Sequence, residues 1–438
     1  MIQKKLLEDA KKFIFSYQNN RYLPLRDSIF YLATYSNFIG SVVLNSFRDK
    51  KYFIKNLSII AKDILYILNY ENCKLFKSKN LVKNYDKVFV TWGFKENFSK
   101  DGSFNDRFFN TNSNYFKNTL WIIIYLDKKN PTKISKNILI FKSNIKKSLN
   151  IFKVIKFILN NLNYLLKGFR YYLCSVSSHN YFASTFLNSV KSYFNENVKF
   201  VVMPYESQPF QNQIISYLKS KHRKIKTLGY IHSPPLAVPA NFIYKTDSPN
   251  KLILNGKDQK KCFVRVLGWR SNRIKILPSF RFKKKKFESK NAILLPLTIQ
   301  NPNKILKALE FLVHKNYLDL GIFDIKNHPA AKYSKKNLKT IKLIKLLKKK
   351  LRKPAKKINK KYFIFIGNSG AIVEYLERGA HVIQICEHSV FDVYTKEVWP
   401  GIISKKIRED IYIYNLKKRG NLIKFGSLNN NTKKIFKI

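Results

Sequence analysis

Cysteine is scarce in this sequence of 438 residues, which contains four. Cys73, Cys174, Cys262 and Cys386 lie far apart and show neither Cys-x-x-Cys nor Cys/His metal-ligand spacing. Neither a zinc site nor a disulfide framework is therefore indicated. A reducing cytoplasm is the simplest setting for such a chain.

Long apolar runs are also missing. No window reaches the ~18 uninterrupted apolar residues that a membrane-spanning helix needs, and even "KVIKFILNNLNYLLKGFRYYL" is interrupted by Lys, Asn and Arg. The N-terminus carries charges among its apolar positions and has no small-residue cleavage site, which argues against a signal peptide. We expect a cytoplasmic chain that is soluble or bound to the surface of a membrane.

Acidic residues are few, with 26 Asp and Glu against 84 Lys and Arg and a net charge of +58. Such a charge suits an anionic partner, for example nucleic acid, an anionic membrane or a phosphorylated substrate. However, the lysines are spread along the whole chain together with many Asn, Ile, Phe and Tyr residues, as an AT-rich genome would produce. The chain also lacks an RRM, KH, helix-turn-helix or zinc-finger signature, so we expect no nucleic-acid partner.

What the sequence does contain is a repeated alternation of strands and helices. Residues 1 to 80 have apolar residues at helical spacing, and from Asp86 onward short runs such as "KVFVTW" and "LWIIIYL" predict buried strands. Strands that are apolar on both faces and alternate with helices predict parallel sheets covered on both sides. We predict an α/β fold with two tandem Rossmann-like, doubly wound domains, at 81–245 and 246–438, after an N-terminal helical region at 1–80.

Open α/β sheets bind ligands beyond the carboxyl ends of their strands. Polar residues follow the predicted strands of both domains at these positions: Tyr205-Glu206, His232-Ser233, Pro278-Ser279-Phe280-Arg281, His328-Pro329 and Gly367-Asn368-Ser369-Gly370. We therefore expect the site in a cleft between the domains.

The segment "FIFIGNSGAIVEYLERG" predicts a phosphate site. Its strand leads through Ser369 and Gly370 directly into a helix, whose first N–H groups favour an anion. A plain N-cap serine is the alternative. His328 ends the preceding strand and would point into the same cleft, with Pro329 fixing its backbone, unless it is a core histidine. Glu374 would hold a ribose hydroxyl or only pair with Arg378.

Two acidic residues are candidates for proton transfer. Glu206 lies among aromatic and Gln residues, where loss of hydration would raise the pKa of its carboxyl group and make it a usable base. Asp106 in "GSFNDRFF" is the second candidate. The alternatives are a solvated loop glutamate and a turn aspartate paired with Arg107.

These motifs resemble GT-B-type glycosyltransferases of bacterial surface-polysaccharide biosynthesis, including capsule and O-antigen (lipopolysaccharide) enzymes. The resemblance rests on the sequences "IKNHP" and "NSGAIVEYLERGAHVIQI", together with "GSFNDRFF", "PYESQPFQNQII", "TLGYIHSPP" and "KILPSFRF". It implies a GT-B-like fold and transfer of a sugar from a nucleotide-activated donor, with CMP-linked sugars among the candidates, to a polysaccharide or lipid-linked acceptor. It also implies donor-side residues, namely Ser279, Arg281, Lys326, His328, Asn368, Ser369, Gly370 and Glu374, and acceptor-side residues, namely Glu206, Asp106 and His232.

Sugar transfer requires two tasks of such a site. The charge on the departing phosphate would be stabilised by His328, Arg281 and the helix start at Ser369. The proton of the acceptor hydroxyl would pass to Glu206, with Asp106 in reserve. No Asp-x-Asp triplet occurs in the chain, which fits a site without metal or cofactor.

Three alternatives stay open at this point. The same phosphate grip would serve a polyol-phosphate transferase, and the chain could be a non-catalytic partner of another transferase. A nucleic-acid-binding protein is the third. The basic run from Lys332 to Lys361 is interpreted as a covering helix or, because anionic lipid attracts lysine, as a face for an anionic membrane surface on the inner side of the cytoplasmic membrane.

Overall fold

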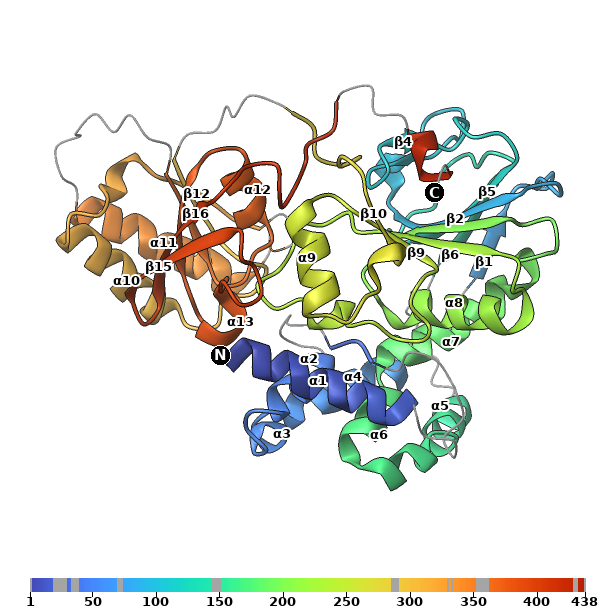
Figure 1. Cartoon of the computed structure of the whole chain (residues 1–438), viewed down its shortest axis with the longest axis horizontal. Coiled ribbons are helices and arrows are strands. Elements are labelled where there is room, and N and C mark those ends of the chain that lie inside the picture. The colour runs from blue at the N-terminus through green and yellow to red at the C-terminus, as the bar shows by residue number, and fades with distance from the viewer. Residues whose placement is uncertain are drawn as a thin grey trace.

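A computed structural model describes most of the chain, namely residues 2–18, 30–32, 39–68, 74–142, 151–284, 291–328, 331, 334–351, 362–427 and 432–436. Cys73, Pro329 and part of the predicted basic run lie outside these residues. Figure 1 shows two α/β units side by side and a group of helices beneath them. Among the described helices, none is long and apolar enough to cross a membrane.

The first unit is built on an eight-stranded sheet with the order β1-β6-β5-β2-β7-β8-β9-β10. All neighbours pair in parallel except β1 and β6. Its strands are β1 (Lys74–Lys77), β2 (Lys87–Gly93), β5 (Thr119–Tyr125), β6 (Ile138–Lys142), β7 (Phe200–Pro204), β8 (Lys226–Tyr230), β9 (Lys251–Leu254) and β10 (Ile274–Ile276). The central strands are buried along most of their length, as the sequence predicted.

The second unit has six strands in the order β12-β11-β13-β14-β16-β15. The first four strands are parallel, and β16 and β15 add an antiparallel edge. The strands are β11 (Ala292–Leu294), β12 (Asp324–Lys326), β13 (Tyr362–Ile366), β14 (His381–Ile385), β15 (Ile402–Arg408) and β16 (Ile411–Leu416). A short hairpin, β3 (Asn105–Asp106) and β4 (Thr111–Asn112), belongs to neither sheet. The chain therefore has two Rossmann-like domains.

The boundary between the two sheets differs from the predicted one at residue 245. Strands β9 and β10, which the sequence analysis assigned to the second domain, pair with β8 and complete the first sheet as far as Ile276. The second sheet begins at Ala292. A strand–helix alternation looks the same in either domain, so the pattern alone does not say which sheet a strand joins.

Helices cover both sheets. In the first domain these are α7 (Ser178–Val190), α8 (Pro209–Lys221) and α9 (Lys257–Arg265), and in the second α10 (Pro302–His314), α11 (Lys335–Lys350), α12 (Ala371–Glu377) and α13 (Ser389–Asp392). Capping side chains fix several starts: Asn301 accepts from Lys304 N–H at α10, and Ser334 accepts from Asn337 N–H at α11. One large buried cluster runs through the first domain and into the second.

A separate layer of helices contains the N-terminal α1 (Ile2–Gln18), α2 (Ile39–Ser46), α3 (Tyr52–Lys55) and α4 (Leu57–Leu68). Two helices that follow β6, α5 (Ile151–Leu159) and α6 (Phe169–Ser175), complete it. Helix α1 connects this layer with the second domain. The Gln3 side chain donates to the carbonyl groups of Val390 and Val393, while Ser16 hydrogen-bonds with Tyr171 on α6.

After β16 the chain returns to the first domain. Residues 420–426 pass between the domains: the Glu377 carboxylate accepts from the N–H groups of Leu422 and Ile423, and Lys424 N–H donates to the Asn255 carbonyl. The short 3-10 helix η8 (Thr432–Phe436) then packs on the first sheet, where Ile435 is fully buried and Phe436 contacts the ring of Phe89. The second domain is thus inserted between two segments of the first.

Candidate functional site

Each sheet has one point at which its strand order reverses direction. In the first sheet this switch lies between β2 and β7, and in the second between β11 and β13. Ligands of open α/β sheets bind at the carboxyl ends of the strands on either side of such a switch. Glu206 follows β7, and Asn368 and Ser369 follow β13, so the topology places these predicted residues at the two switch points.

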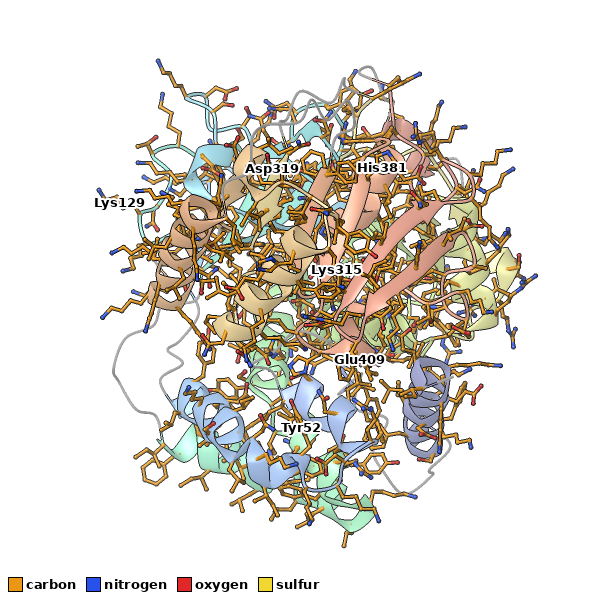
Figure 2. The ribbon with its side chains drawn as sticks, turned by 90° about the vertical axis from the view of Figure 1, so that its left-hand side faces the viewer. Tyr52, Lys129, Lys315, Asp319, His381 and Glu409 are labelled. Atoms are coloured by element: carbon orange, nitrogen blue, oxygen red, sulfur yellow. The ribbon has the colours of Figure 1, made fainter. Side chains whose placement is uncertain are left out.

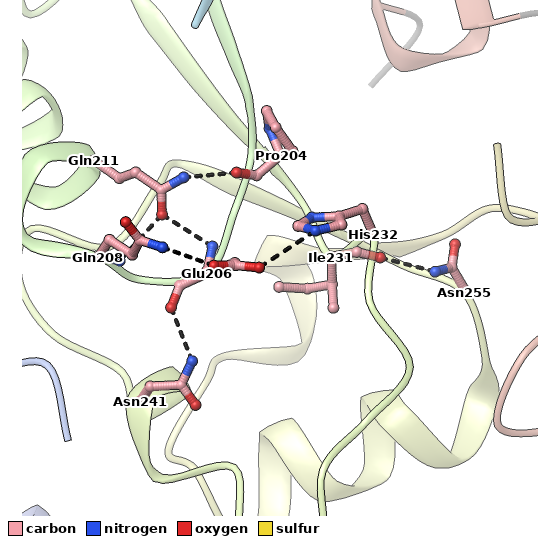
Figure 3. A network of polar contacts seen from close by, with 8 residues as sticks. All are labelled: Pro204, Glu206, Gln208, Gln211, Ile231, His232, Asn241 and Asn255. Carbon is pink, nitrogen blue, oxygen red and sulfur yellow. Dashed lines mark hydrogen bonds and ion pairs between the residues drawn. The ribbon is translucent and has the colours of Figure 1, made fainter. Parts of the chain in front are cut away.

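The loop after β7 is held rigidly by α8. The Gln211 side chain accepts from Glu206 N–H (2.9 Å) and donates to the Pro204 carbonyl (2.6 Å), and Asn241 donates to the Glu206 carbonyl (2.8 Å) (Figure 3). The loop therefore presents the Glu206 side chain from a backbone that is bound on both sides.

Backbone strain is stored directly beside this carboxylate. Ser207 has φ 59°, the left-handed region that residues other than glycine avoid. The buried ammonium group of Lys245 donates to Ser207 Oγ (2.8 Å) and to the Phe30 carbonyl (2.8 Å). Loss of hydration lowers the pKa of Lys245 to about 8. Strain of this kind persists where the surroundings impose it, and it clusters at active sites.

Glu206 forms an ion pair with His232, which follows the neighbouring strand β8. The distance from Glu206 Oε1 to His232 Nε2 is 3.3 Å, and Glu206 Oε2 accepts from Gln208 Nε2 at 2.7 Å (Figure 3). The side chain of Glu206 is 30% exposed and that of His232 only 4%. A ligand can therefore reach the carboxylate, while the imidazole supports it from behind.

The pKa of Glu206 moves in the opposite direction to our prediction. Burial by itself would raise this pKa, but the hydrogen bond and the charge of His232, with smaller contributions from Gln208 and Arg281, outweigh it and lower the pKa below its ordinary 4.5. Glu206 is therefore ionised at neutral pH.

His232 is packed between aromatic rings, with Phe108 at 4.4 Å and Trp92 at 6.3 Å between ring centroids. Asn255 donates to the Ile231 carbonyl just before it (Figure 3). Within the described part of the chain, the Nδ1 atom of His232 is buried and has no hydrogen-bond partner. A buried polar atom in this condition is uncommon in folded proteins, and a catalytic role is one of the explanations for it.

Asp106, our second candidate for proton transfer, is buried in the turn before Phe108. It is 2% exposed, and its Oδ1 accepts from the N–H groups of Phe108 (2.8 Å) and Phe109 (2.6 Å). Its Oδ2 accepts from the Thr91 hydroxyl (2.6 Å). Burial raises the pKa of Asp106 despite these bonds. Its oxygens are thus engaged in holding the loop that carries Arg107 and Phe108.

Arg281 lies in the loop after β10, and Ser279 supports that loop from inside. Ser279 is fully buried; its hydroxyl hydrogen-bonds with Tyr230 (3.2 Å) and accepts from Phe282 N–H (2.9 Å). Arg281 itself is exposed. Reduced hydration and then the charge of Arg107 lower the pKa of Arg281, while Glu374 and Glu206 act in the opposite direction.

Arg107 is the residue that the sequence analysis missed. Its guanidinium lies over the rings of Phe94 (4.8 Å) and Phe108 (5.1 Å), and it is exposed. The guanidinium groups of Arg107 and Arg281 lie near each other beside Glu206. Together they can bind an anion. In a chain with 84 Lys and Arg, only the contact with Phe108 and the proximity to Arg281 distinguish Arg107 from the others.

The start of α12 in the second domain contacts the loop that follows His232 in the first domain. A Cβ atom on Gly370 would lie 2.9 Å from the Pro234 carbonyl oxygen, so only glycine allows this approach. The Tyr394 hydroxyl hydrogen-bonds with the carbonyl groups of both Pro235 (2.9 Å) and Ser369 (3.2 Å). The loop after β8 in the first domain therefore meets the loop after β13 in the second. Gly370, just before α12, already has helical angles (φ −62°, ψ −24°), so Ser369 lies at the helix start and its interpretation as a plain N-cap stays open.

Glu374 lies in the first turn of the same helix, α12. Its carboxylate pairs with Arg378 at 3.0 Å, as the alternative interpretation expected, and its charge also acts on Arg281 across the boundary between the domains. Its side chain is 22% exposed. It can still accept from a bound hydroxyl, because each carboxylate oxygen has two lone pairs.

His328 and Lys326 are placed differently from our expectation. Strand β12, which they end, is an edge strand, and β11 lies between it and β13. The inference that successive strands are neighbours therefore fails here, and both side chains are exposed. Limited hydration lowers the pKa of His328, so it is neutral at pH 7.

A pocket of about 390 Å³ lies elsewhere, between α5, α7 and α8. Amide and hydroxyl side chains line it, including Asn160, Asn180, Ser184 and Gln213, and no acidic or basic residue does. It lacks a group suited to proton transfer or phosphate binding, so Glu206 and its neighbours remain the candidate site. Within the described residues, no group of three His, Cys, Asp or Glu side chains could hold a metal ion.

Comparisons with known proteins give only a loose likeness. No protein-family model matches the chain, and no curated protein does. The N-terminal domain of trehalose-6-phosphate phosphatase from Candida albicans has a TM-score of 0.37 and 10% identity, over 70% of this chain and 88% of that one. A glycosyltransferase from Rickettsia africae has a TM-score of 0.34 and 13% identity, over 72% and 88%. The wall teichoic acid polymerase TagF has a TM-score of 0.30 and 12% identity, over 81% of each chain. At these values no residue can be carried from one chain to another.

Proposed function

We propose that this chain is a glycosyltransferase, which moves a sugar from a nucleotide-activated donor to the hydroxyl group of an acceptor. The observation that carries this proposal is the Glu206–His232 pair at the switch point of the first sheet, directly beside the contact of Pro234 with Gly370 at the switch point of the second. Two Rossmann-like domains whose strand-end loops contact each other suit two substrates, a nucleotide on one and an acceptor on the other.

The roles of the residues follow from their charge and exposure. The acceptor oxygen bonds to the anomeric carbon, the bond from that carbon to the phosphate oxygen breaks, and the nucleotide leaves with the electron pair. Arg281 and Arg107 supply positive charge where this negative charge develops. Guanidinium groups can do this without a metal ion, and EDTA should leave the transfer rate unchanged.

Glu206 receives the proton of the acceptor hydroxyl in this proposal. Its carboxylate is ionised and partly exposed, whereas the oxygens of Asp106 are occupied by backbone and Thr91 donors. His232 holds Glu206 in place and stabilises its charge before the proton arrives. Asn368, Ser369 and Glu374 remain our candidates for nucleotide contacts from the second domain, and His328 and Lys326 would contact the more distant part of the donor.

The identity of the acceptor is a further part of the proposal. The resemblance of the motifs to surface-polysaccharide enzymes supports a polysaccharide or lipid-linked acceptor at the inner face of the cytoplasmic membrane, in capsule or lipopolysaccharide synthesis. A polyol-phosphate transferase would use the same two arginines, but the acceptor hydroxyl would attack phosphorus instead of the anomeric carbon. Its product would therefore retain the phosphate. Mass analysis of the product distinguishes the two reactions.

A thermal-shift screen tests the donor site first. The full chain is heated with CMP, CDP, UMP, UDP, GDP, dTDP and short oligonucleotides. One nucleotide should raise Tm, because a ligand that binds only the folded state stabilises it. Arg281→Met should abolish the shift, and Arg273→Met, which removes an arginine whose guanidinium binds the Tyr244 hydroxyl outside the cleft, should not.

Turnover tests the acid–base assignment. Glu206→Gln should bind the nucleotide as the wild type does and lose transfer. Normal transfer by this variant would refute the role of Glu206. Stabilisation by oligonucleotides alone would refute the transferase, and nucleotide binding without transfer to any acceptor would leave a non-catalytic partner as the correct description.

A further inference from the structure

Helix α5, the following 3-10 helix η2 (Leu162–Lys167) and the start of α6 expose an unusual number of large apolar side chains. Phe152 is 85% and Leu166 is 90% exposed. The other members are between 44% and 56% exposed, namely Ile151, Ile155, Leu159, Leu162, Leu165 and Phe169. We call these eight residues the apolar face. The cost of leaving so much apolar surface in water indicates that something covers it.

The apolar face is one side of an amphipathic structure. Val154, on the opposite side of α5, is buried, and the ring of Phe157 packs on Tyr181 of α7 at 5.1 Å. Tyr164 on η2 is likewise buried. The helices are thus fixed to the domain on their inner side, and the exposed residues are presented outward as a set.

The face continues over a neighbouring helix. Phe53 of α3 contacts the Phe169 ring at 5.5 Å, and the next residue, Ile54, is 72% exposed. Leu57, at the start of α4, is 57% exposed. These helices lie together below the two domains in Figure 1, and Figure 2 shows Tyr52 of α3 at the same end of the molecule. The apolar residues therefore gather at one end rather than being scattered.

The charges around this end are positive. Exposed lysines lie on or next to α3, α4, α5 and η2, namely Lys50, Lys51, Lys55, Lys62, Lys156 and Lys167. Of the acidic residues on the same helices, Asp49 pairs with Lys55 at 2.9 Å, and Asp63 is buried, where it accepts from the Ser178 N–H and hydroxyl groups. An apolar strip with a rim of lysines is complementary to a layer of acyl chains beneath anionic headgroups.

We propose that the apolar face binds an anionic lipid bilayer, with α5 and η2 lying in the headgroup boundary. Protein–protein interfaces are depleted of lysine relative to the rest of the surface, and here leucine, isoleucine and phenylalanine protrude between lysines. The inference concerns a surface outside the cleft and holds whether or not the cleft transfers a sugar. Helix α8 connects the two: it follows the Glu206 loop, and its Gln213 lines the pocket behind Phe157.

This placement differs from the basic run that the sequence analysis singled out. On α11, the described part of that run, Ile344 is fully buried and Leu347 nearly so, while Leu346 is 62% exposed among lysines. The buried side of α11 therefore packs on the second domain, as a covering helix does, although Leu338 near its start is 44% exposed. Helix α11 supplies a matched control for the experiment.

Vesicle co-sedimentation of the full chain tests the proposal. Vesicles of phosphatidylcholine alone are compared with equimolar phosphatidylcholine and phosphatidylglycerol. The wild type should pellet with the mixed vesicles. The double variant Phe152→Ser, Leu166→Ser should lower the partition coefficient by about tenfold or more, because each side chain would otherwise bury most of its apolar area. Leu346→Ser should bind like the wild type.

Other results would overturn the proposal. These are no binding of the wild type to mixed vesicles, equal binding of the double variant, or a loss of binding in Leu346→Ser. Self-association of the wild type that the double variant abolishes would identify a contact between copies instead. All three proteins should keep the wild-type Tm and the same shift with nucleotide in the absence of lipid, so a failure here is separable from a failure of the proposed function.

Discussion

The contact between Glu206 and His232 can be tested without knowing any substrate. The single variants Glu206→Gln and His232→Gln and their double variant form a mutant cycle in which the packing of His232 against Phe108 cancels. A hydrogen bond to a charged group contributes about 1.5 to 3 kcal/mol. Because Glu206 is 30% exposed and the two atoms are 3.3 Å apart, we expect a coupling around or below the lower limit of this range, about 1 to 2 kcal/mol at pH 7.

Urea unfolding at several pH values measures the coupling and its sign. The pKa of Glu206 is lowered below 4.5 in the folded chain, so its contribution is complete above that pH and is lost as the pH falls through the lower folded value. The coupling should therefore hold at pH 7 and 5.5 and shrink in more acidic solution. Glu206→Gln combined with His381→Gln, on the other sheet, should be additive. A coupling below about 0.5 kcal/mol at pH 7, the limit of additivity for distant sites, would refute the pair.

Three further predictions concern residues outside the Glu206–His232 pair, two in the second domain and one beside the Glu206 loop. Gly370→Ala should lower Tm, because its new Cβ would lie 2.9 Å from the Pro234 carbonyl oxygen, with a cost of about 1 to 3 kcal/mol; an unchanged Tm would show that the domains do not approach so closely. Asp392→Asn should raise the free energy of unfolding above pH 7, since burial raises the pKa of Asp392 from 3.8 to about 7; that gap is equivalent to at most about 4 kcal/mol. The gain should shrink as the pH falls from 7 and disappear only below the unfolded pKa of 3.8, where Asp392 is neutral in both the folded and the unfolded chain. A gain independent of pH in urea unfolding would contradict the assignment. Lys245→Met should lower kcat with little change in KM for the donor, because it releases strained Ser207 without touching the nucleotide side; a change in KM alone would place Lys245 in substrate binding.

The sequence predicted the elements of this fold well, because its strands are apolar on both faces and its helices carry their own start signals. It did not predict which strands are neighbours, since pairing depends on contacts distant in the sequence. Strand β10 joins the first sheet, and β11 separates the strand of His328 from that of Ser369. One pattern of alternation fits either arrangement.

The site was predictable in part for the same reason. The rule that ligands bind at strand ends found Glu206, His232 and Arg281, which the fold brings near one another. The sequence did not predict which loop residues are buried. Ser279 also follows a strand, but it is buried and hydrogen-bonds with Tyr230. The direction of the pKa shift of Glu206 depends on His232, which is 26 positions away, so a prediction from local neighbours had the wrong sign.

The return of the chain has a consequence for how the protein is made. Phe436 lies against Phe116 at 5.5 Å and Phe200 at 5.4 Å, and Ile435 is fully buried, on the sheet whose strands begin before residue 150. A ribosome produces the whole second domain before it releases these side chains. During translation, the part of the first sheet that Ile435 and Phe436 cover must therefore stay exposed until the chain is finished. The second domain can complete its fold before the first, although it comes later in the chain.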